Sequence, residues 1–356
     1  MMQILDYLKT AVQEGASDLF IVAGGHVSVK TDKRIRNISD ERVTPDASEA
    51  LIRELYRLAE RSEDLCLHNK KDNFSLSVAG LARFRVNVFH QRGSLAAVVR
   101  VIQFGIPDWQ EMGIKEQVMS LADISRGLVL VTGLADSGKS ITGACLIDRI
   151  NRTRDCHIIT IENPIEYLHR NQRSIVSQQE VAIDVEDSVT ALQDCLLQAP
   201  DVIFLSEMQS PELIRMAISA AETGRLVIGT RYAKDAVSAI DYMIHSFPID
   251  QQDTLRMRVS MCLRAIVSQQ LLPGSSGQAI PAFEVMRMNP TIQSMIRNNE
   301  LYDIKGEILN GKRSDMLSMD QSLLELYGEE LIDKDVVLDH AIDQEQMRRK
   351  MWVVRA

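Results

Sequence analysis

A run of apolar residues leads directly into a glycine-containing loop at residues 127–140. Residues 127–133, GLVLVTG, are almost continuously apolar, which is typical of a parallel strand that is buried on both faces. Residues 133–140, GLADSGKS, have the G-x-x-x-x-G-K-S spacing of a phosphate-binding loop, and a helical pattern follows. Strand, loop and helix in this order predict an α/β nucleotide-binding fold. The alternative is a glycine turn that precedes a helix by chance.

Strand-like and helix-like segments continue to alternate after this loop. Apolar runs recur at 157–162 (HIITIE), 201–206 (DVIFLS) and 225–230 (RLVIGT). Segments with helical patterns lie at 140–153, 187–198 and 211–224. Such alternation predicts a doubly wound α/β core with a parallel sheet.

The first hundred residues have a different pattern. A helical stripe at the N-terminus precedes short strands and a second helix at 49–65, and residues 73–102 alternate like three antiparallel strands with turns at Gly80 and Gly93. These features predict a separate α+β module. We therefore expect an N-terminal domain at 1–102, a linker at 103–125, the nucleotide-binding core at 126–270 and a helical C-terminal region at 271–356.

Composition limits the functions open to the chain. Its 356 residues suffice for two or three domains, and the net charge of −9 disfavours direct binding of nucleic acid. The five cysteines are dispersed, as expected of reduced thiols in a cytoplasmic protein. We expect no signal peptide and no membrane-spanning segment, so that any role at a membrane requires a partner.

The phosphate loop predicts how a nucleotide is held. Backbone N–H groups of the loop and the start of the next helix face the phosphates, Lys139 contacts the β- and γ-phosphates, and Ser140 ligates Mg²⁺. Asp136 is unusual, because a carboxylate opposes anion binding unless it points to solvent. The predicted nucleotide-binding residues are Gly133, Leu134, Ala135, Asp136, Ser137, Gly138, Lys139, Ser140 and Ile141.

Two glutamates follow predicted strands of the core. Glu162 ends HIITIE and Glu207 follows DVIFLS. Because the carboxyl ends of parallel strands face the ligand crevice, we expect both glutamates to activate water and, with Ser140, to hold Mg²⁺. The alternative is a pair of surface carboxylates at strand exits.

Seven segments, in chain order, resemble the retraction-type motor ATPases of bacterial type IV pili, the twitching-motility branch of the secretion ATPase superfamily. They are 15–19, 82–102, 159–169, 173–181, 199–208, 217–230 and 271–286. The resemblance implies an N-terminal PAS-like α+β domain, a RecA-like P-loop NTPase core and a helical C-terminal region. It also implies homohexameric rings, in which ATP lies between a core and an N-terminal domain.

The resemblance implies that arginines of the N-terminal domain approach the phosphates. The candidates are Arg83, Arg85, Arg92 and Arg100. Four arginines in one predicted sheet of an acidic chain favour an anionic partner. The alternative is a set of ordinary solvated arginines on alternating outward positions.

Several positions depart from the family pattern. Asn163 replaces an aspartate of the acidic box, and Tyr232 stands where the histidine box has its histidine. A neutral phenol cannot replace an imidazole in proton transfer near pH 7. Three further departures are Leu134, Ala135 and Asp136 in the phosphate loop, and three more are Ser206, Gln209 and Ser210 around Glu207. Gln193 and Leu197 stand in place of arginines, and Gln293 and Ser294 occupy the motif tied to retraction. Neutral divergence is the alternative explanation.

These observations support three functional hypotheses. The first is an ATP-hydrolysing hexameric motor that drives pilus retraction and works at the cytoplasmic face of the membrane, where it binds an inner-membrane platform protein. The second is a weakly hydrolytic nucleotide-binding subunit that assists or regulates a sister pilus ATPase. A more remote third is a motor for DNA uptake or secretion.

Overall fold

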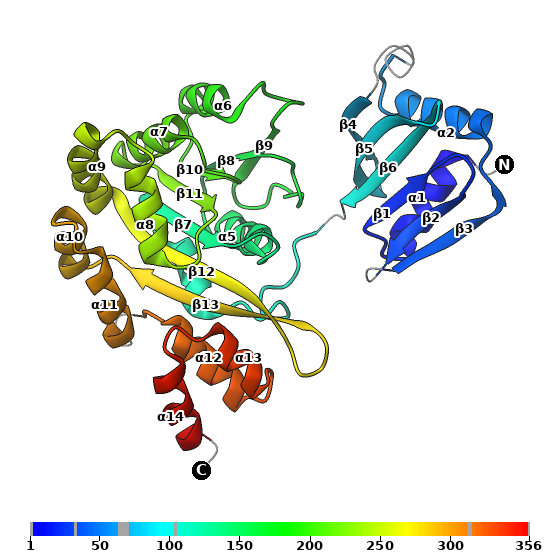
Figure 1. Ribbon diagram of the computed structural model, residues 1–356. Coiled ribbons are helices and arrows are strands. Elements are labelled where there is room, and N and C mark those ends of the chain that lie inside the picture. Colours follow the sequence, from blue (N-terminus) through cyan, green and yellow to red (C-terminus); the bar gives the residue numbers. More distant parts are fainter. Residues whose placement is uncertain (1–2, 32–33, 63–70, 103–104, 312–314, 355–356) are drawn as a thin grey trace. The chain divides into compact units, whose positions relative to one another are not determined.

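The computed structural model describes residues 3–31, 34–62, 71–102, 105–311 and 315–354. The chain divides into two compact units, Met1–Gly105 with Glu166–Leu168, and Ile106–Ile165 with His169–Ala356 (Figure 1). Each unit has a β-sheet of its own. Within the described ranges, no helix has both the length and the apolar character needed to cross a membrane.

The N-terminal unit is built on a six-stranded antiparallel sheet with the order β3-β2-β1-β6-β5-β4. The strands are β1 Asp18–Ile21, β2 His26–Thr31, β3 Arg34–Arg42, β4 Lys71–Val78, β5 Ala82–Gln91 and β6 Ser94–Ile102. Helices α1 (Ile4–Gln13) and α2 (Pro45–Leu58) pack their apolar residues against one face of this sheet. The three predicted strands at 73–102 are confirmed as β4, β5 and β6.

Two details of this unit differ from the sequence prediction. Strand β3 carries mostly exposed and charged residues, so it lacks the alternation by which a strand is predicted. Helix α2 begins earlier than predicted, because Thr44 accepts a hydrogen bond from the backbone N–H of Ala47 and Pro45 occupies the first helical position. The last residues of the predicted helix, 63–65, lie outside the described residues.

The C-terminal unit has a seven-stranded sheet with the order β13-β12-β7-β11-β10-β8-β9. The strands are β7 Gly127–Gly133, β8 His157–Glu162, β9 Ile175–Glu180, β10 Val202–Leu205, β11 Leu226–Arg231, β12 Leu263–Pro273 and β13 Ala279–Arg287. All neighbouring strands are parallel except β13, which pairs antiparallel with β12. The predicted parallel α/β core is present.

Helices cover both faces of this sheet, as the continuous burial of β7 and β10 requires (Figure 1). Alternate residues such as Leu130 and Leu205 pack towards α6 (Ser188–Cys195), α7 (Pro211–Glu222), α8 (Ala236–His245) and α9 (Ile249–Cys262). The intervening residues, such as Val131 and Phe204, pack towards α5 (Lys139–Thr153) and α4 (Glu116–Met119). Two single turns complete the unit: η1 (Ser120–Asp123) before β7 and η2 (Leu196–Gln198) after α6. The predicted linker at 103–125 is wrong for most of its length, because residues 106–125 belong to this unit and Val118 and Leu121 pack in its core.

The sheet extends beyond the boundary that the sequence suggests at 270/271. The segment PGSSGQ is the turn of the β12–β13 hairpin, in which the N–H of Gly274 donates to the carbonyl of Gln278 at 2.8 Å. The helices therefore begin later than 271. They are α10 Pro290–Arg297, η3 Leu301–Asp303, α11 Ile304–Asn310, α12 Met319–Gly328, α13 Lys334–His340 and α14 Gln344–Val354. Helices α12 to α14 share a small apolar core with the hairpin.

Candidate nucleotide site

The phosphate loop joins β7 to α5, as predicted, and α5 begins at Lys139. Gly138 precedes the helix with φ at +86°, and a Cβ atom there would lie 2.8 Å from Nε2 of Gln269. At Gly133 a Cβ atom would lie 2.5 Å from the carbonyl oxygen of Gln269 and closer still to Oγ of Ser137. Both positions therefore require glycine, and Gln269 sets the space available to the loop.

Strand β12 forms hydrogen bonds with residues on both sides of the phosphate loop. The hydroxyl of Thr142, in the first turn of α5, donates to Oε1 of Gln269 at 2.7 Å. One strand position away, the hydroxyl of Thr132 donates to Oγ of Ser268 at 2.9 Å. Sequence reasoning missed Gln269, because nothing in the motif indicates which distant strand lies beside the loop.

The Lys139 ammonium lies over the loop itself. Its Nζ donates to the carbonyl oxygens of Gly133 at 3.0 Å and of Leu134 at 2.5 Å. The same Nζ lies 4.7 Å from the centroid of the Tyr232 ring. Lys139 of the phosphate loop and Tyr232, at the altered histidine position, are therefore in contact.

The other loop residues differ in exposure. Leu134 is 63% exposed, and Ala135 and Asp136 are also exposed, whereas Ser137 is buried. Ser140 and Ile141 are half-buried in the first turn of α5. The exposure of Asp136 meets the condition under which an acid in this loop has little effect on anion binding.

The two predicted glutamates lie at the same edge of the sheet as the loop. In the strand order, Glu207 follows β10, two strands from β7, and Glu162 ends β8, one strand further. At about 4.8 Å between strands, Glu207 begins roughly 10 Å from the end of β7 along the sheet, and Glu162 roughly 14 Å. The strand that precedes Glu207 is therefore nearer to β7 than the strand that ends at Glu162.

Hydrogen bonds fix the Glu162 carboxylate. Its Oε1 accepts from the Thr160 hydroxyl at 2.6 Å and from Nε2 of Gln178 at 3.0 Å. Only 8% of Glu162 is exposed. Glu207 is half-buried and accepts a short hydrogen bond from Nε2 of Gln209. These partners orient both carboxylates.

Asn163 and Ser206, two positions that depart from the family pattern, take part in hydrogen bonds between neighbouring strand ends. The Asn163 N–H donates to Oγ of Ser206 at 3.0 Å, and the Ser206 carbonyl accepts a short hydrogen bond from the Thr230 hydroxyl. Arg231 donates through Nη1 to the Met208 carbonyl at 2.5 Å. The ends of β8, β10 and β11 are thus linked.

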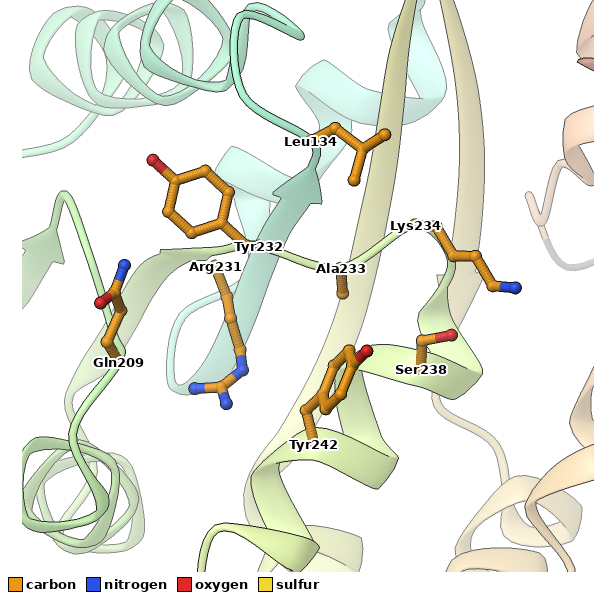
Figure 2. A pocket seen from close by; sticks show the side chains of 8 residues that line it. All are labelled: Leu134, Gln209, Arg231, Tyr232, Ala233, Lys234, Ser238 and Tyr242. Carbon is orange, nitrogen blue, oxygen red and sulfur yellow. The ribbon is translucent and has the colours of Figure 1, made fainter.

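A pocket of about 560 Å³ lies beside the phosphate loop. Figure 2 shows Leu134 from the loop, Arg231 and Tyr232 at the end of β11, and Tyr242 rising from α8. Arg231 and Tyr232 point to different sides, as neighbouring residues of an extended chain do. The complete lining is Leu134, Gln209, Arg231, Tyr232, Ala233, Lys234, Ser238 and Tyr242.

The four candidate arginines lie in the N-terminal unit. Arg83 and Arg85 are half-buried on β5, Arg92 lies in the β5–β6 turn with φ at +49°, and Arg100 is exposed on β6. Arg85 pairs in register with Arg100, whose Nε donates to Oδ1 of Asp18 at 3.1 Å. The sheet brings Arg85 and Arg100 together, while Arg92 is at its end.

The two positions at which the resemblance implies arginines are open to solvent. Gln193, on α6, is exposed, and Leu197, in η2, is 88% exposed. In the motif tied to retraction, Gln293 and Ser294 are half-buried on α10. None of these four side chains carries a charge.

Comparison with known proteins places the chain in a family. The family described as Type II/IV secretion system protein matches residues 2–330. The chain is 35% identical to the Type IV pilus ATPase PilU of Pseudomonas aeruginosa, over 98% of this chain and 91% of that protein. It is also 35% identical to the Type IV pilus retractation ATPase PilT of the same organism, over 94% of this chain and 96% of that protein.

Solved structures of similar proteins agree with this family assignment. The crystal structure of the pilus retraction motor PilT with bound ADP has a TM-score of 0.90 at 37% identity, over 98% of this chain and 100% of that one. The ATPase DotB of Legionella pneumophila shares the fold, with a TM-score of 0.78 at 19% identity over 94% of this chain and 93% of that one. The resemblance and the fold class predicted from the sequence are confirmed. The chain belongs to the family of type II/IV secretion system proteins.

Proposed function

We propose that this chain is an ATP-hydrolysing motor of the type IV pilus machinery that powers pilus retraction and twitching motility. The observation that supports this function most strongly is the phosphate loop Gly133–Ser140, set between β7 and α5 with Lys139 at the start of the helix. The chain is 35% identical to the retraction ATPase PilT over nearly its whole length.

The loop residues 133–141 would hold the phosphates of ATP. The left-handed conformation of Gly138 suits a loop whose N–H groups converge on an anion, and the N-terminus of α5 adds a favourable dipole. Lys139 supplies a positive charge that can reach the β- and γ-phosphates.

The residues present fit a magnesium ion that is held mainly by substrate and water. Among the described residues, no group of three or more His, Cys, Asp or Glu side chains could enclose a metal. Magnesium typically takes one or two protein ligands together with phosphates and waters. Ser140 would supply a direct ligand, and Glu162 and Glu207 would act through water; the ion, when bound, neutralises phosphate charge.

Hydrolysis would depend on the oriented carboxylates. Glu207 follows β10, which is nearer to β7 than β8 is, and would position and deprotonate the attacking water. Glu162, held by Thr160 and Gln178, would keep a second negative charge at the same sheet edge.

The assembly and location follow from the same proposal. Six copies would form a ring in which Arg83, Arg85, Arg92 and Arg100 of an N-terminal domain approach ATP on the α/β core of the same or a neighbouring copy. The ring would work in the cytoplasm against an inner-membrane platform protein, with no direct contact to nucleic acid. A sister pilus ATPase is a further partner.

A second candidate function is a nucleotide-binding subunit that assists a sister ATPase and turns over slowly. It is favoured by Tyr232, whose phenol lies against Lys139 where the family has a histidine. One of the relatives at 35% identity is the pilus ATPase PilU.

Steady-state ATP hydrolysis by the full chain tests the motor. The motor predicts turnover that Glu207→Gln lowers by about 10²–10³-fold, as expected on loss of a proton-transfer group, with nucleotide binding intact. Glu212→Gln, at an exposed carboxylate in the first turn of α7, is the matched control and should retain turnover. Binding without measurable turnover by the wild type would instead support the assisting subunit.

A further inference from the structure

The ring of Tyr232 contacts the charged end of the phosphate-loop lysine. The centroid of the ring lies 4.7 Å from Nζ of Lys139, within the range of a cation–π interaction. The same Nζ donates to the carbonyls of Gly133 and Leu134 at 3.0 and 2.5 Å. The ammonium is thus held between the ring and the carbonyls of its own loop.

The two chain neighbours of Tyr232 are held in place by the fold. Arg231 immediately before it ends β11 and donates to the Met208 carbonyl at 2.5 Å and to Oγ of Ser246 at 3.4 Å. Ala233 immediately after it is only 3% exposed and belongs to the main core of the unit. With both neighbours fixed, the position of the Tyr232 backbone is set by the fold and does not depend on a ligand.

This arrangement competes with nucleotide binding. A triphosphate in the loop attracts the same ammonium towards its β- and γ-phosphates. When Lys139 moves to them, it gives up the loop carbonyls and changes its distance from the ring. Because the ring is attached to a fixed strand end, it cannot follow the lysine freely, and part of the attraction is lost.

We propose that Tyr232 is a positioning residue that retains Lys139 on the loop carbonyls before nucleotide binds and thereby lowers the affinity for the triphosphate. This inference rests on the proposed nucleotide-binding function. Tyr232 is 47% exposed, so the attraction corresponds to the weaker cation–π contacts, about 2- to 5-fold in the dissociation constant.

Calorimetric titration of the full chain with MgATP tests the inference. Tyr232→Phe keeps the ring and should bind like the wild type, because the hydroxyl takes no part in the contact. Tyr232→Leu removes the ring and should bind MgATP about 2- to 5-fold more tightly. Tyr302→Leu is the control: Tyr302 is an exposed tyrosine in η3 that is not part of the pocket lining, and this variant should bind like the wild type.

Two results would overturn the inference while leaving the proposed function in place. One is an affinity of Tyr232→Leu equal to or weaker than that of the wild type. The other is a Tyr232→Phe variant that behaves like Tyr232→Leu, since the hydroxyl and not the ring would then matter. A wild type and a Tyr232→Leu variant that both fail to bind MgATP contradict the proposed function as well.

Discussion

Gly138 shows how closely a single residue controls the phosphate loop. Its φ of +86° is strained for any residue with a side chain, and the Nε2 atom of Gln269 lies 2.8 Å from the position of a Cβ atom. Gln269 is itself held by the Thr142 hydroxyl. An added methyl group therefore meets both backbone strain and a neighbour that is already hydrogen-bonded.

We predict that Gly138→Ala lowers the free energy of unfolding by about 1–3 kcal/mol and weakens nucleotide binding, because the loop must shift to admit the methyl group. Chemical denaturation measures the first effect. Gly306→Ala in α11 is the control: Gly306 has no neighbour within 4 Å of an added Cβ, and alanine favours the helix. Equal stabilities for the two alanine variants would contradict the steric account.

The loop residues themselves can be predicted from the sequence, and most of their surroundings cannot. Lys139 and Ser140 follow from spacing, because the motif, the preceding strand and the following helix are continuous in the chain. Gln269 on β12 and the Tyr232 ring reach the loop only through the strand order of the sheet. No local pattern specifies that order, so these contacts require the three-dimensional structure.

At the scale of secondary-structure elements, the start of α8 is held by two carboxyl groups. Asp235 caps the helix through the N–H of Ser238 at 2.7 Å and pairs with Lys305 at 3.3 Å. Glu284, on β13, accepts from the N–H of Ala236 at 2.9 Å and is only 4% exposed. Burial, with smaller contributions from Asp235 and Asp320, raises the pKa of Glu284 from 4.5 to about 7.

The raised pKa of Glu284 predicts a pH-dependent stability. Between about pH 4.5 and 7 the folded state binds more protons at this group than the unfolded state does. The stability contributed by the protonated group is therefore complete below about pH 4.5 and is lost as the pH rises through about 7. Over this pH range the free energy of unfolding falls by roughly 3 kcal/mol.

Glu284→Gln should remove this dependence, because the neutral amide keeps an oxygen for the Ala236 N–H. At pH 8 the variant should be more stable than the wild type, and between pH 5 and 8 its difference from the wild type should grow. Urea denaturation across this pH range provides the measurement, with Glu329→Gln at an exposed carboxylate as control. A constant difference at all pH values would show that Glu284 does not titrate in this window.

Elements with buried periodic residues were predictable, and edge elements were not. Strands β7, β8, β10 and β11 are rich in apolar residues and buried along nearly their whole length, so they can be predicted from the sequence alone. Strand β9 is a half-exposed edge strand, and its sequence IVSQQE carries no such signal. The β12–β13 hairpin was missed because its glycine turn resembles a domain boundary.

At the scale of the whole molecule, the chain carries an arginine pair in one unit and a phosphate loop in the other. Arg85 and Arg100 occupy directly opposite positions on β5 and β6, where two like charges repel each other. Asp18 neutralises Arg100 at 3.1 Å. In the proposed ring, a nucleotide phosphate would supply an anion to Arg85.

We predict that Arg85→Gln lowers kcat/KM for ATP on the order of 10²-fold, the effect of losing one positioned charge in a phosphate site. Arg42→Gln, at an exposed arginine on the edge strand β3, should leave it unchanged. Hydrolysis rates at several ATP concentrations give kcat and KM separately. Equal values of kcat/KM for the two variants would show that the Arg85 side chain does not contribute to ATP hydrolysis.

The central claim is that the loop Gly133–Ser140 binds MgATP through Lys139 for hydrolysis. Its most direct test is a titration of the full chain with MgATP, repeated with Lys139→Ala. The loss of a charge-assisted hydrogen bond predicts binding by the wild type and an affinity about 10- to 100-fold weaker in the variant. Equal affinities of the two proteins, or no binding by the wild type, would contradict the claim.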